Sequence, residues 1–346
     1  MNFYSGIGHY TDTVMDWLKY KADGKEGYNI ILAARLSGTP HIGTLVNFMV
    51  GYKLAFELST QYHKKVKIAI ELLDNISDEK INDMIYYNNK AYYYKQLVSN
   101  SVVLQKRYYE FYRMISRLNE LCNVTVEVKT YQDIQQDKQM RNAISEVLVH
   151  RNYFSKIFNP RNERLHIRIA CPKCGLIEKN CTDINVEQYS DDEFCISSIC
   201  PVHGLFHVFF SSHNQEYIDI NIPFRHFCKG LSLLDADKRN NHLSIQVLGN
   251  DWSGGWPIRM FCEGAIYLKR EQLPTILFSP LVIKDGIKIS KSNIFDEKNQ
   301  EKILDINKLT MQQLHIIWNE IERWFQSSNL FFDNYNSKYF ERILCK

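Results

Sequence analysis

The N-terminal third of the chain contains a strand pattern, a turn, a helix pattern and a second strand pattern in close succession. Residues 28–35 are a short apolar run typical of a buried strand, and residues 37–40 (Ser-Gly-Thr-Pro) supply a turn directly after it. Apolar residues then recur at helical spacing over residues 45–58, and residues 66–73 form another apolar run. This order predicts the opening of a parallel α/β sheet.

The pattern changes further along the chain. Residues 78–121 look largely helical and are rich in tyrosine, residues 124–129 predict a strand, and residues 137–158 predict one helix that ends at Asn159-Pro160. From about residue 164 to residue 225, short β-prone pieces, turn residues and cysteine pairs predominate, which indicates an inserted subdomain.

Strand and helix patterns resume after this insertion. Residues 243–249 and 275–283 predict two more buried strands, separated by a glycine-rich turn and a helix that reaches about residue 267. Residues 301–346 look helical and amphipathic. The predicted layout is therefore a split α/β sheet with a cysteine-rich insert between its halves.

The turn after the first predicted strand reads Pro40-His41-Ile42-Gly43-Thr44. Helix N-termini present free N–H groups and a positive dipole end, which favour phosphate. Gly43 lets a nucleotide approach the backbone closely, while His41 and Thr44 offer side-chain donors. Without a second motif, this sequence would be typical of an ordinary turn with a capping histidine.

A basic motif, Lys288-Ile289-Ser290-Lys291-Ser292, follows the last predicted strand and a glycine turn. Its ammonium and hydroxyl groups can close over a triphosphate and stabilise the departing pyrophosphate, although a solvated basic loop has the same composition. The two motifs occur in this order, each after a strand, and the combination is more specific than either motif alone. Together they resemble the HIGH and KMSKS signatures of class I aminoacyl-tRNA synthetases.

More narrowly, the chain resembles the catalytic core of class I lysyl-tRNA synthetases over roughly residues 10–300. The stretches that carry this resemblance are Asp12–Lys19 (an N-terminal helix), Ser37-Gly38 (a substrate-binding turn), Glu71–Asp74 (an acidic segment), Arg141–Phe158 with Cys171–Gly175 (a helix and a zinc knuckle) and Gly249-Asn250-Asp251 (a Gly-x-Asp near the ATP ribose).

The resemblance implies a Rossmann-like parallel sheet of the HIGH/KMSKS nucleotidyl-transferase type, with an inserted zinc ribbon and a short helical C-terminus. It also implies a ligase that uses ATP and Mg²⁺ to form an aminoacyl-adenylate, and that passes the acyl group to a tRNA 3′ end or to a small acceptor. The implied segments are 1–130 (first half of the catalytic domain), 131–240 (connective insertion, with the zinc ribbon at about 165–210), 241–300 (second half with the basic loop) and 301–346 (helical tail).

The resemblance also implies roles for individual residues. His41, Lys288 and Lys291 would be catalytic. The expected ATP-binding residues are Gly38, Pro40, His41, Gly43, Thr44, Gly249, Asp251, Lys288, Ser290, Lys291 and Ser292. The expected amino-acid pocket consists of Ala33, Arg35, Ser37, Asp74 and Trp252.

Two cysteine-containing knuckles lie in the insert, Cys171-x-x-Cys174 and Cys200-x-x-His203. Each has a proline after the first ligand and a glycine after the second, which suits a tight turn around a metal. Four nitrogen and sulfur ligands predict a closed, structural tetrahedral zinc site, with Cys181 or Cys195 as possible replacements for His203.

The chain departs from the lysyl pattern in two places. Only about 50 residues follow Ser292, so we expect a truncated paralogue without the anticodon-recognising domain, whose tail packs against the catalytic core. Arg35 stands where the family carries a small neutral residue, and a cation in the pocket would disfavour lysine. Arg35 could equally point away from the pocket and pair with an acidic neighbour.

Bulk properties leave other functions open. The net charge of +3 does not demand a nucleic-acid partner, no apolar run predicts a membrane span, and the start of the chain lacks a signal-peptide pattern, so we expect a cytoplasmic protein. Two alternatives are a nucleotidylyltransferase with similar phosphate chemistry and a non-catalytic RNA-binding paralogue. For the second, basic residues interleave with tyrosines between residues 86 and 117, although an amphipathic surface helix has the same composition.

Overall fold

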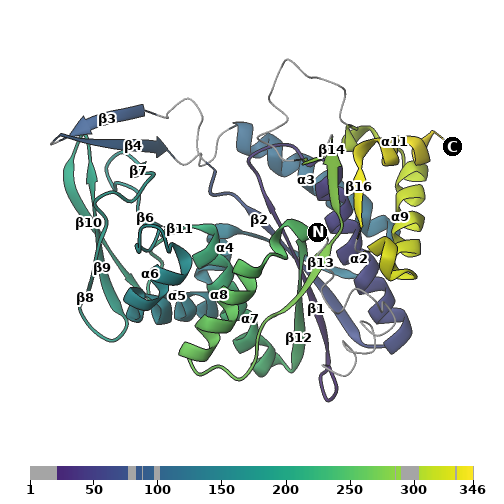
Figure 1. Cartoon of the computed structure of the whole chain (residues 1–346), viewed down its shortest axis with the longest axis horizontal. Helices are drawn as coiled ribbons and strands as arrows, with labels where there is room; N and C mark the ends of the chain where they lie inside the picture. Colours follow the sequence, from purple (N-terminus) through teal and green to yellow (C-terminus); the bar gives the residue numbers. More distant parts are fainter. Residues whose placement is uncertain are drawn as a thin grey trace.

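A five-stranded parallel sheet lies at the centre of the molecule (Figure 1). The structure is a computed structural model that describes residues 22–76, 83–87, 89–96, 102–284, 286–289, 304–331 and 333–345. The strand order of the central sheet is β13-β12-β1-β2-β5, and all neighbouring strands are parallel. The strands are β1 (Gly27–Arg35), β2 (Lys65–Leu73), β5 (Thr125–Thr130), β12 (His242–Gly249) and β13 (Thr275–Ser279). The predicted α/β fold is confirmed.

One face of this sheet is apolar. Tyr28, Ile30 and Leu32 alternate along β1, are fully buried, and pack in one core with α2 (Ile42–Tyr62). The contact is close at Gly51, because a Cβ at this position would lie 2.6 Å from Cδ2 of Leu32.

The opposite face carries polar groups and is covered by α7 (Ile222–Asn240). On this face, Ser244 of β12 donates a hydrogen bond to Asp237 of α7, and Glu71 of β2 accepts one from Lys229 of α7 at 2.5 Å. The two faces of one sheet therefore have different chemistry.

The tyrosine-rich segment is not the long helix that its pattern predicts. Its first described part is a hairpin of β3 (Asp83–Tyr87) and β4 (Lys90–Gln96), and among its described residues only α3 (Val102–Leu121) is helical. Tyr92 and Tyr94 are buried while Tyr93 is 42% exposed, which is the two-residue period of a strand. Three tyrosines in a row conceal this period, so the helical prediction was wrong here.

The insert holds a second apolar core, formed by helices and short strands (Figure 1). The predicted helix over residues 137–158 is two helices, because the backbone departs from helical geometry at His150. The elements are α4 (Tyr131–Gln136), α5 (Lys138–Val149), α6 (Arg151–Phe158), β6 (Ile167–Arg168), β7 (Leu176–Glu178), β8 (Asn185–Gln188), β9 (Glu193–Cys200), β10 (Gly204–Ser211) and β11 (Asp219–Ile220). The helix α8 (Gly255–Tyr267), which the sequence predicts, also contributes to this core.

The C-terminal segment packs against α2 and adds a strand beside the one that leads to the basic motif. The single strand predicted over residues 275–283 is interrupted at Pro280, after which β14 (Leu281–Lys284) pairs with β15 (Ile287–Lys288) and, in parallel, with β16 (Asn334–Asn336). The sequence did not predict β16. Its flanking helices are α9 (Met311–Phe325), α10 (Ser328–Phe331) and α11 (Ser337–Leu344).

The tail packs against the core, as predicted: Trp324 is fully buried in the same core as α2 and stacks on Tyr335 with ring centroids 4.1 Å apart. None of the described helices combines the length and the apolar character needed to cross a membrane.

Candidate active site and metal centre

The segments after β1 and β12 lie where the strand order of the sheet reverses. These two strands are neighbours, with β2 and β5 beyond β1 and with β13 beyond β12. In open parallel sheets, ligands bind outside the carboxyl ends of the strands at this switch point. The turn that contains His41 follows β1, and the turn Asn250–Trp252 follows β12. The topology therefore places two of the predicted nucleotide-binding segments side by side.

His41 is the N-cap residue of α2, with extended backbone angles of φ −119° and ψ 172°. A Cβ at Gly43 would lie 3.2 Å from Cε1 and Nδ1 of His41 and 3.7 Å from Cβ of Val282. The His41 ring and β14 thus meet at the first turn of a 21-residue helix, where the helix dipole is positive. Any side chain at position 43 would press on the His41 ring.

The other predicted residues of this turn differ in exposure. Gly38 and Pro40 are buried, Ser37 is exposed, and Thr44 is half-buried in the first turn of α2.

Lys288 and Asp251 form an ion pair across the two motifs. Lys288 lies on the β14–β15 hairpin, and Asp251 lies just beyond β12. A Cβ at Gly249 would lie 2.6 Å from Oδ1 of Asp251, so the absence of a side chain at Gly249 makes room for this carboxylate. The residues predicted to bind the ribose and the phosphates are therefore paired with each other here. Ser290, Lys291 and Ser292 lie outside the described residues.

The residues predicted to form the amino-acid pocket are not all directed to one place. Ala33 is half-buried on the face that α7 covers, and it lies opposite Glu71 in the register of β1 and β2. Trp252 packs against His226 of α7, with ring centroids 5.0 Å apart. Asp74 instead accepts hydrogen bonds from the backbone N–H of Tyr131 at 3.2 Å and from the hydroxyl of Tyr108 at 3.1 Å. Its carboxylate therefore links the end of β2 to α3 and α4.

Several residues of α7 border this region although the sequence analysis assigned them no role. Burial, together with the nearby charges of Arg225 and Lys229, lowers the pKa of His226 well below its ordinary value, so His226 is neutral at pH 7. Burial also lowers the pKa of Lys229, and the Glu71 carboxylate opposes this shift. A clue in the sequence was the run Arg225-His226, followed one helical turn later by Lys229.

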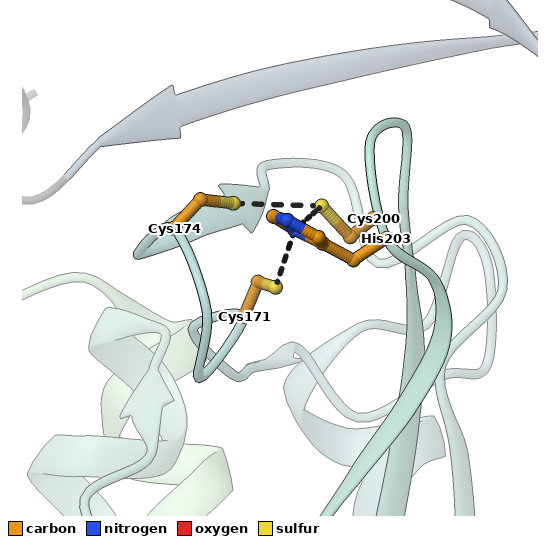
Figure 2. A group of neighbouring side chains, drawn as sticks. All are labelled: Cys171, Cys174, Cys200 and His203. Carbon is orange, nitrogen blue, oxygen red and sulfur yellow. Dashed lines mark hydrogen bonds between the residues drawn. The ribbon is translucent and has the colours of Figure 1, made fainter.

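The four predicted zinc ligands come together at one end of the ribbon (Figure 2). Their ligand atoms all lie within 4.8 Å of one another. Three pairs are 3.5 Å apart, namely Sγ of Cys171 and Nδ1 of His203, Sγ of Cys174 and Sγ of Cys200, and Sγ of Cys200 and Nδ1 of His203.

The geometry of this group fits a tetrahedral metal. Tetrahedral Zn–S and Zn–N bonds put neighbouring ligand atoms roughly 3.5–3.8 Å apart, close to the observed spacing. Gly175 and Gly204, each after the second ligand of its knuckle, both have a φ of 73°, which favours glycine. Burial raises the pKa of the Cys171 thiol, but the backbone N–H groups of Lys173 and Cys174 outweigh it and the pKa is lowered. Burial and the neighbouring thiols raise the pKa of Cys174 to about 11, and a divalent cation would offset that repulsion.

The two spare cysteines do not belong to this group. Among the described residues, only Cys171, Cys174, Cys200 and His203 form a metal-compatible cluster. Cys181 is buried elsewhere, and burial raises the pKa of its thiol to about 12. Within the described chain, His203 is therefore not replaced by Cys181 or Cys195.

Comparison with known proteins yields fold neighbours but no family. The chain matches no known family model and none of the curated proteins. Among solved structures, it is similar to a glutamate-tRNA synthetase from Elizabethkingia anophelis (9% identity, TM-score 0.42, covering 92% of this chain and 70% of that one). It is also similar to a putative arginyl-tRNA synthetase from Campylobacter jejuni (12% identity, TM-score 0.36, 82% and 63%) and to a tryptophanyl-tRNA synthetase from Plasmodium falciparum (10% identity, TM-score 0.37, 95% and 75%).

These similarities are too distant to assign a substrate. This chain spans 63% of the length of the Campylobacter structure, and the TM-scores are all below 0.5. None of the three is a lysyl enzyme, so the narrower resemblance to lysyl-tRNA synthetases remains a hypothesis.

Proposed function

We propose that this chain is an ATP-dependent enzyme that activates an amino acid as an aminoacyl-adenylate and releases pyrophosphate. The observation that carries the proposal is the meeting of three segments at the switch point of the sheet. His41 begins a long helix there, Asp251 follows the neighbouring strand, and Lys288 reaches Asp251 from a hairpin that contacts the same helix.

The chemistry needs positioning and charge rather than a protein nucleophile. The substrate carboxylate attacks the α-phosphorus of ATP, the bond to the β-phosphate oxygen breaks, and pyrophosphate leaves. We assign the α2 N-terminus and His41 to the phosphates, Asp251 to the ribose, and Lys288 and Lys291 to the charge that develops on pyrophosphate. Mg²⁺ bound with ATP would neutralise part of that charge.

Isotope exchange between ATP and pyrophosphate tests this assignment. We expect amino-acid-dependent exchange by the full chain, and we expect His41→Ala to lower the exchange rate by about 10²–10³-fold because it removes a transition-state donor. His242→Ala is the matched control, since His242 begins β12 and lies at the opposite end of that strand from Asp251.

Two results would contradict the proposal. Undiminished exchange in the His41→Ala variant would show that His41 does not take part in the reaction. Absence of exchange with every amino acid, together with nucleotide transfer to a phosphorylated substrate, would show a nucleotidylyltransferase instead. Adding tRNA or small amines to an active preparation then identifies the acceptor, either a tRNA 3′ end or a small molecule.

We further propose that Cys171, Cys174, Cys200 and His203 bind a structural zinc ion within the connective insertion. A closed set of four ligands leaves no position for substrate, so the ion would stabilise the short strands around it. Cys174→Ser should abolish zinc measured by elemental analysis and lower the melting temperature, whereas Cys345→Ser, at an exposed cysteine of the tail, should change neither. Full zinc content in Cys174→Ser would contradict the assignment.

A further inference from the structure

Cationic side chains gather beside the carboxyl ends of β1 and β2. Among the described residues these cations are Arg35 (β1), Lys95 (β4), Arg168 (β6), Arg225 and Lys229 (α7). The carboxylates that form ion pairs within this group are Glu71 (β2) and Asp219 (β11), and Asp74 and Glu178 also lie near its members.

Both ion-paired carboxylates are already engaged. Asp219 is fully buried, and its Oδ2 lies 3.0 Å from Nζ of Lys95 and 2.9 Å from Nε of Arg168. Burial would raise the pKa of Asp219, but these two cations outweigh it and the pKa is lowered, so Asp219 is ionised at pH 7. Glu71 pairs with Lys229 at 2.5 Å. Neither carboxylate has its charge available for a further cation.

Neither Glu71 nor Asp219 forms an ion pair with Arg225, the remaining cation of α7 in this cluster. Its residue is 9% exposed, and its guanidinium carbon lies 5.3 Å from the centroid of the Tyr131 ring. Within the described part of the chain, no carboxylate forms an ion pair with Arg225. A guanidinium so far removed from water is unfavourable without an anion, and an aromatic face compensates only part of that cost.

A second guanidinium, that of Arg35, lies close enough to be repelled by Arg225. Burial lowers the pKa of Arg35, and among the charged neighbours Arg225 contributes most to that shift. Arg35 follows Ala33 on the face of β1 that α7 covers, six residues before His41. Nη2 of Arg35 is 3.4 Å from the carbonyl oxygen of Asn75. These two guanidinium groups therefore border the candidate active site.

Asn75 adds an acceptor at this place. Its Nδ2 donates a hydrogen bond to Asp219 at 3.0 Å, while its Oδ1, in a residue 5% exposed, pairs with no donor among the described residues. Two guanidinium groups and a carbonyl acceptor together suit a ligand that carries both carboxylate and ammonium groups.

We propose that the amino acid activated here has an acidic side chain, whose carboxylate binds Arg225 and Arg35. This inference rests on the proposed function and specifies its substrate class. A guanidinium presents parallel N–H donors that match a carboxylate, and the burial of Arg225 strengthens its pairing, while Arg35 is exposed. The same charges repel the side-chain ammonium group of lysine. The substrate class suggested by the lysyl resemblance is therefore disfavoured at this site.

The test compares isosteric acidic and neutral amino acids on the full chain. We expect exchange with L-glutamate or L-aspartate to exceed exchange with L-glutamine or L-asparagine by at least about tenfold in kcat/KM, the ratio expected for one lost charge-assisted hydrogen bond. Arg225→Met should reduce this ratio toward one through KM, whereas Arg259→Met, at a 73% exposed side chain on α8, should leave it unchanged.

Calorimetric binding without ATP separates this inference from the proposed function. If no amino acid supports exchange but L-glutamate or L-aspartate still binds, and Arg225→Met weakens that binding, the acidic-ligand site at Arg225 stands while the activating function fails. Preferred exchange with lysine or a neutral amino acid would overturn the inference and leave the function standing. Binding of inorganic phosphate without binding of either acidic amino acid would overturn it in favour of a phosphate site.

Because Arg225→Met could fold poorly, its melting temperature is measured alongside, and Arg35→Met provides a second variant. Removal of an uncompensated cation should leave the melting temperature of the ligand-free chain unchanged or higher. A marked drop in both variants, with unchanged amino-acid preference, would show that the guanidiniums have a structural role only.

Discussion

The two faces of the central sheet differ in a way that separates stability from function. On the face toward α2, consecutive strands present Ile and Leu side chains that are fully buried and need no polar partner. On the face toward α7, the same strands present Asn29, Glu71 and Gln246 among charged groups of the helix. The apolar face can only hold the fold together, whereas the polar face contains groups whose partners are incomplete.

Incomplete pairing occurs on the polar face. Gln246 is 1% exposed, and within the described chain neither its Oε1 nor its Nε2 has a hydrogen-bond partner. Buried polar atoms are normally satisfied, so such atoms on this face favour bound water or ligand there.

The largest expected effect concerns the buried ion pair of the polar face. Glu71→Gln leaves the Lys229 ammonium group buried without an anion and should lower the free energy of unfolding by about 3–5 kcal/mol in urea titrations. The double variant Glu71→Gln/Lys229→Met should recover much of this loss. Glu263→Gln, which removes an exposed pair on α8, should change stability by less than about 1 kcal/mol. If Glu71→Gln and Glu263→Gln lowered the free energy of unfolding equally, burial of the Glu71–Lys229 pair would have no special effect on stability.

A cavity created on the apolar face should lower the stability of the chain without changing its preference among amino-acid substrates. Leu32→Ala should lower the free energy of unfolding by about 2–5 kcal/mol, because Leu32 is fully buried between β1 and α2. Leu205→Ala, at a 73% exposed position of β10, is the control and should be nearly neutral. A changed ratio of acidic to neutral amino-acid exchange in Leu32→Ala would show that the two faces are not independent.

Gly51 tests how closely α2 lies on the sheet. Alanine is favoured over glycine in helices by about 1 kcal/mol, but its Cβ would lie 2.6 Å from Leu32, and overpacking costs about 1–3 kcal/mol. We expect Gly51→Ala to destabilise the chain slightly in thermal unfolding. A clear gain in stability would mean that the Leu32 side chain moves aside easily.

The variant with the smallest expected effect should stabilise the chain, whereas the variants above should destabilise it. Gln246→Leu removes two buried polar atoms that lack partners and should stabilise the ligand-free chain by roughly 1 kcal/mol in urea titrations. The same change at Gln326, an exposed residue at the end of α9, should have no measurable effect. Destabilisation by Gln246→Leu would indicate that buried water satisfies the amide.

Local patterns predicted the parts of the molecule that depend on neighbouring residues. The strand, turn and helix around His41 are found as predicted, and the two cysteine knuckles meet as predicted because each ligand pair is set by its own turn. The tyrosine segment was misread because residues of one type stand on both faces of β4. The β14–β16 pairing depends on two segments about 50 residues apart, for which no local signal exists.

The cationic cluster was inaccessible to sequence reasoning for the same reason. Its members lie between residues 35 and 229 of the chain. Only tertiary packing shows that Asp219 forms ion pairs with Lys95 and Arg168 but not with Arg225, which lies over the ring of Tyr131. Arg35 was noticed, but its direction depends on which face of β1 the helix α7 covers. A parallel strand buried on both sides carries no pattern that reveals this.

The parallel pairing of β14 with β16 gives the C-terminal segment a mechanical connection to the proposed chemistry. Hydrogen bonds join residues 281–283 to residues 334–336, and Val282 in turn contacts the first turn of α2 beside His41. A cut in the chain between α9 and β16 should therefore loosen the Lys288 hairpin and, because α9 also packs in the core with α2, the first turn of α2 as well.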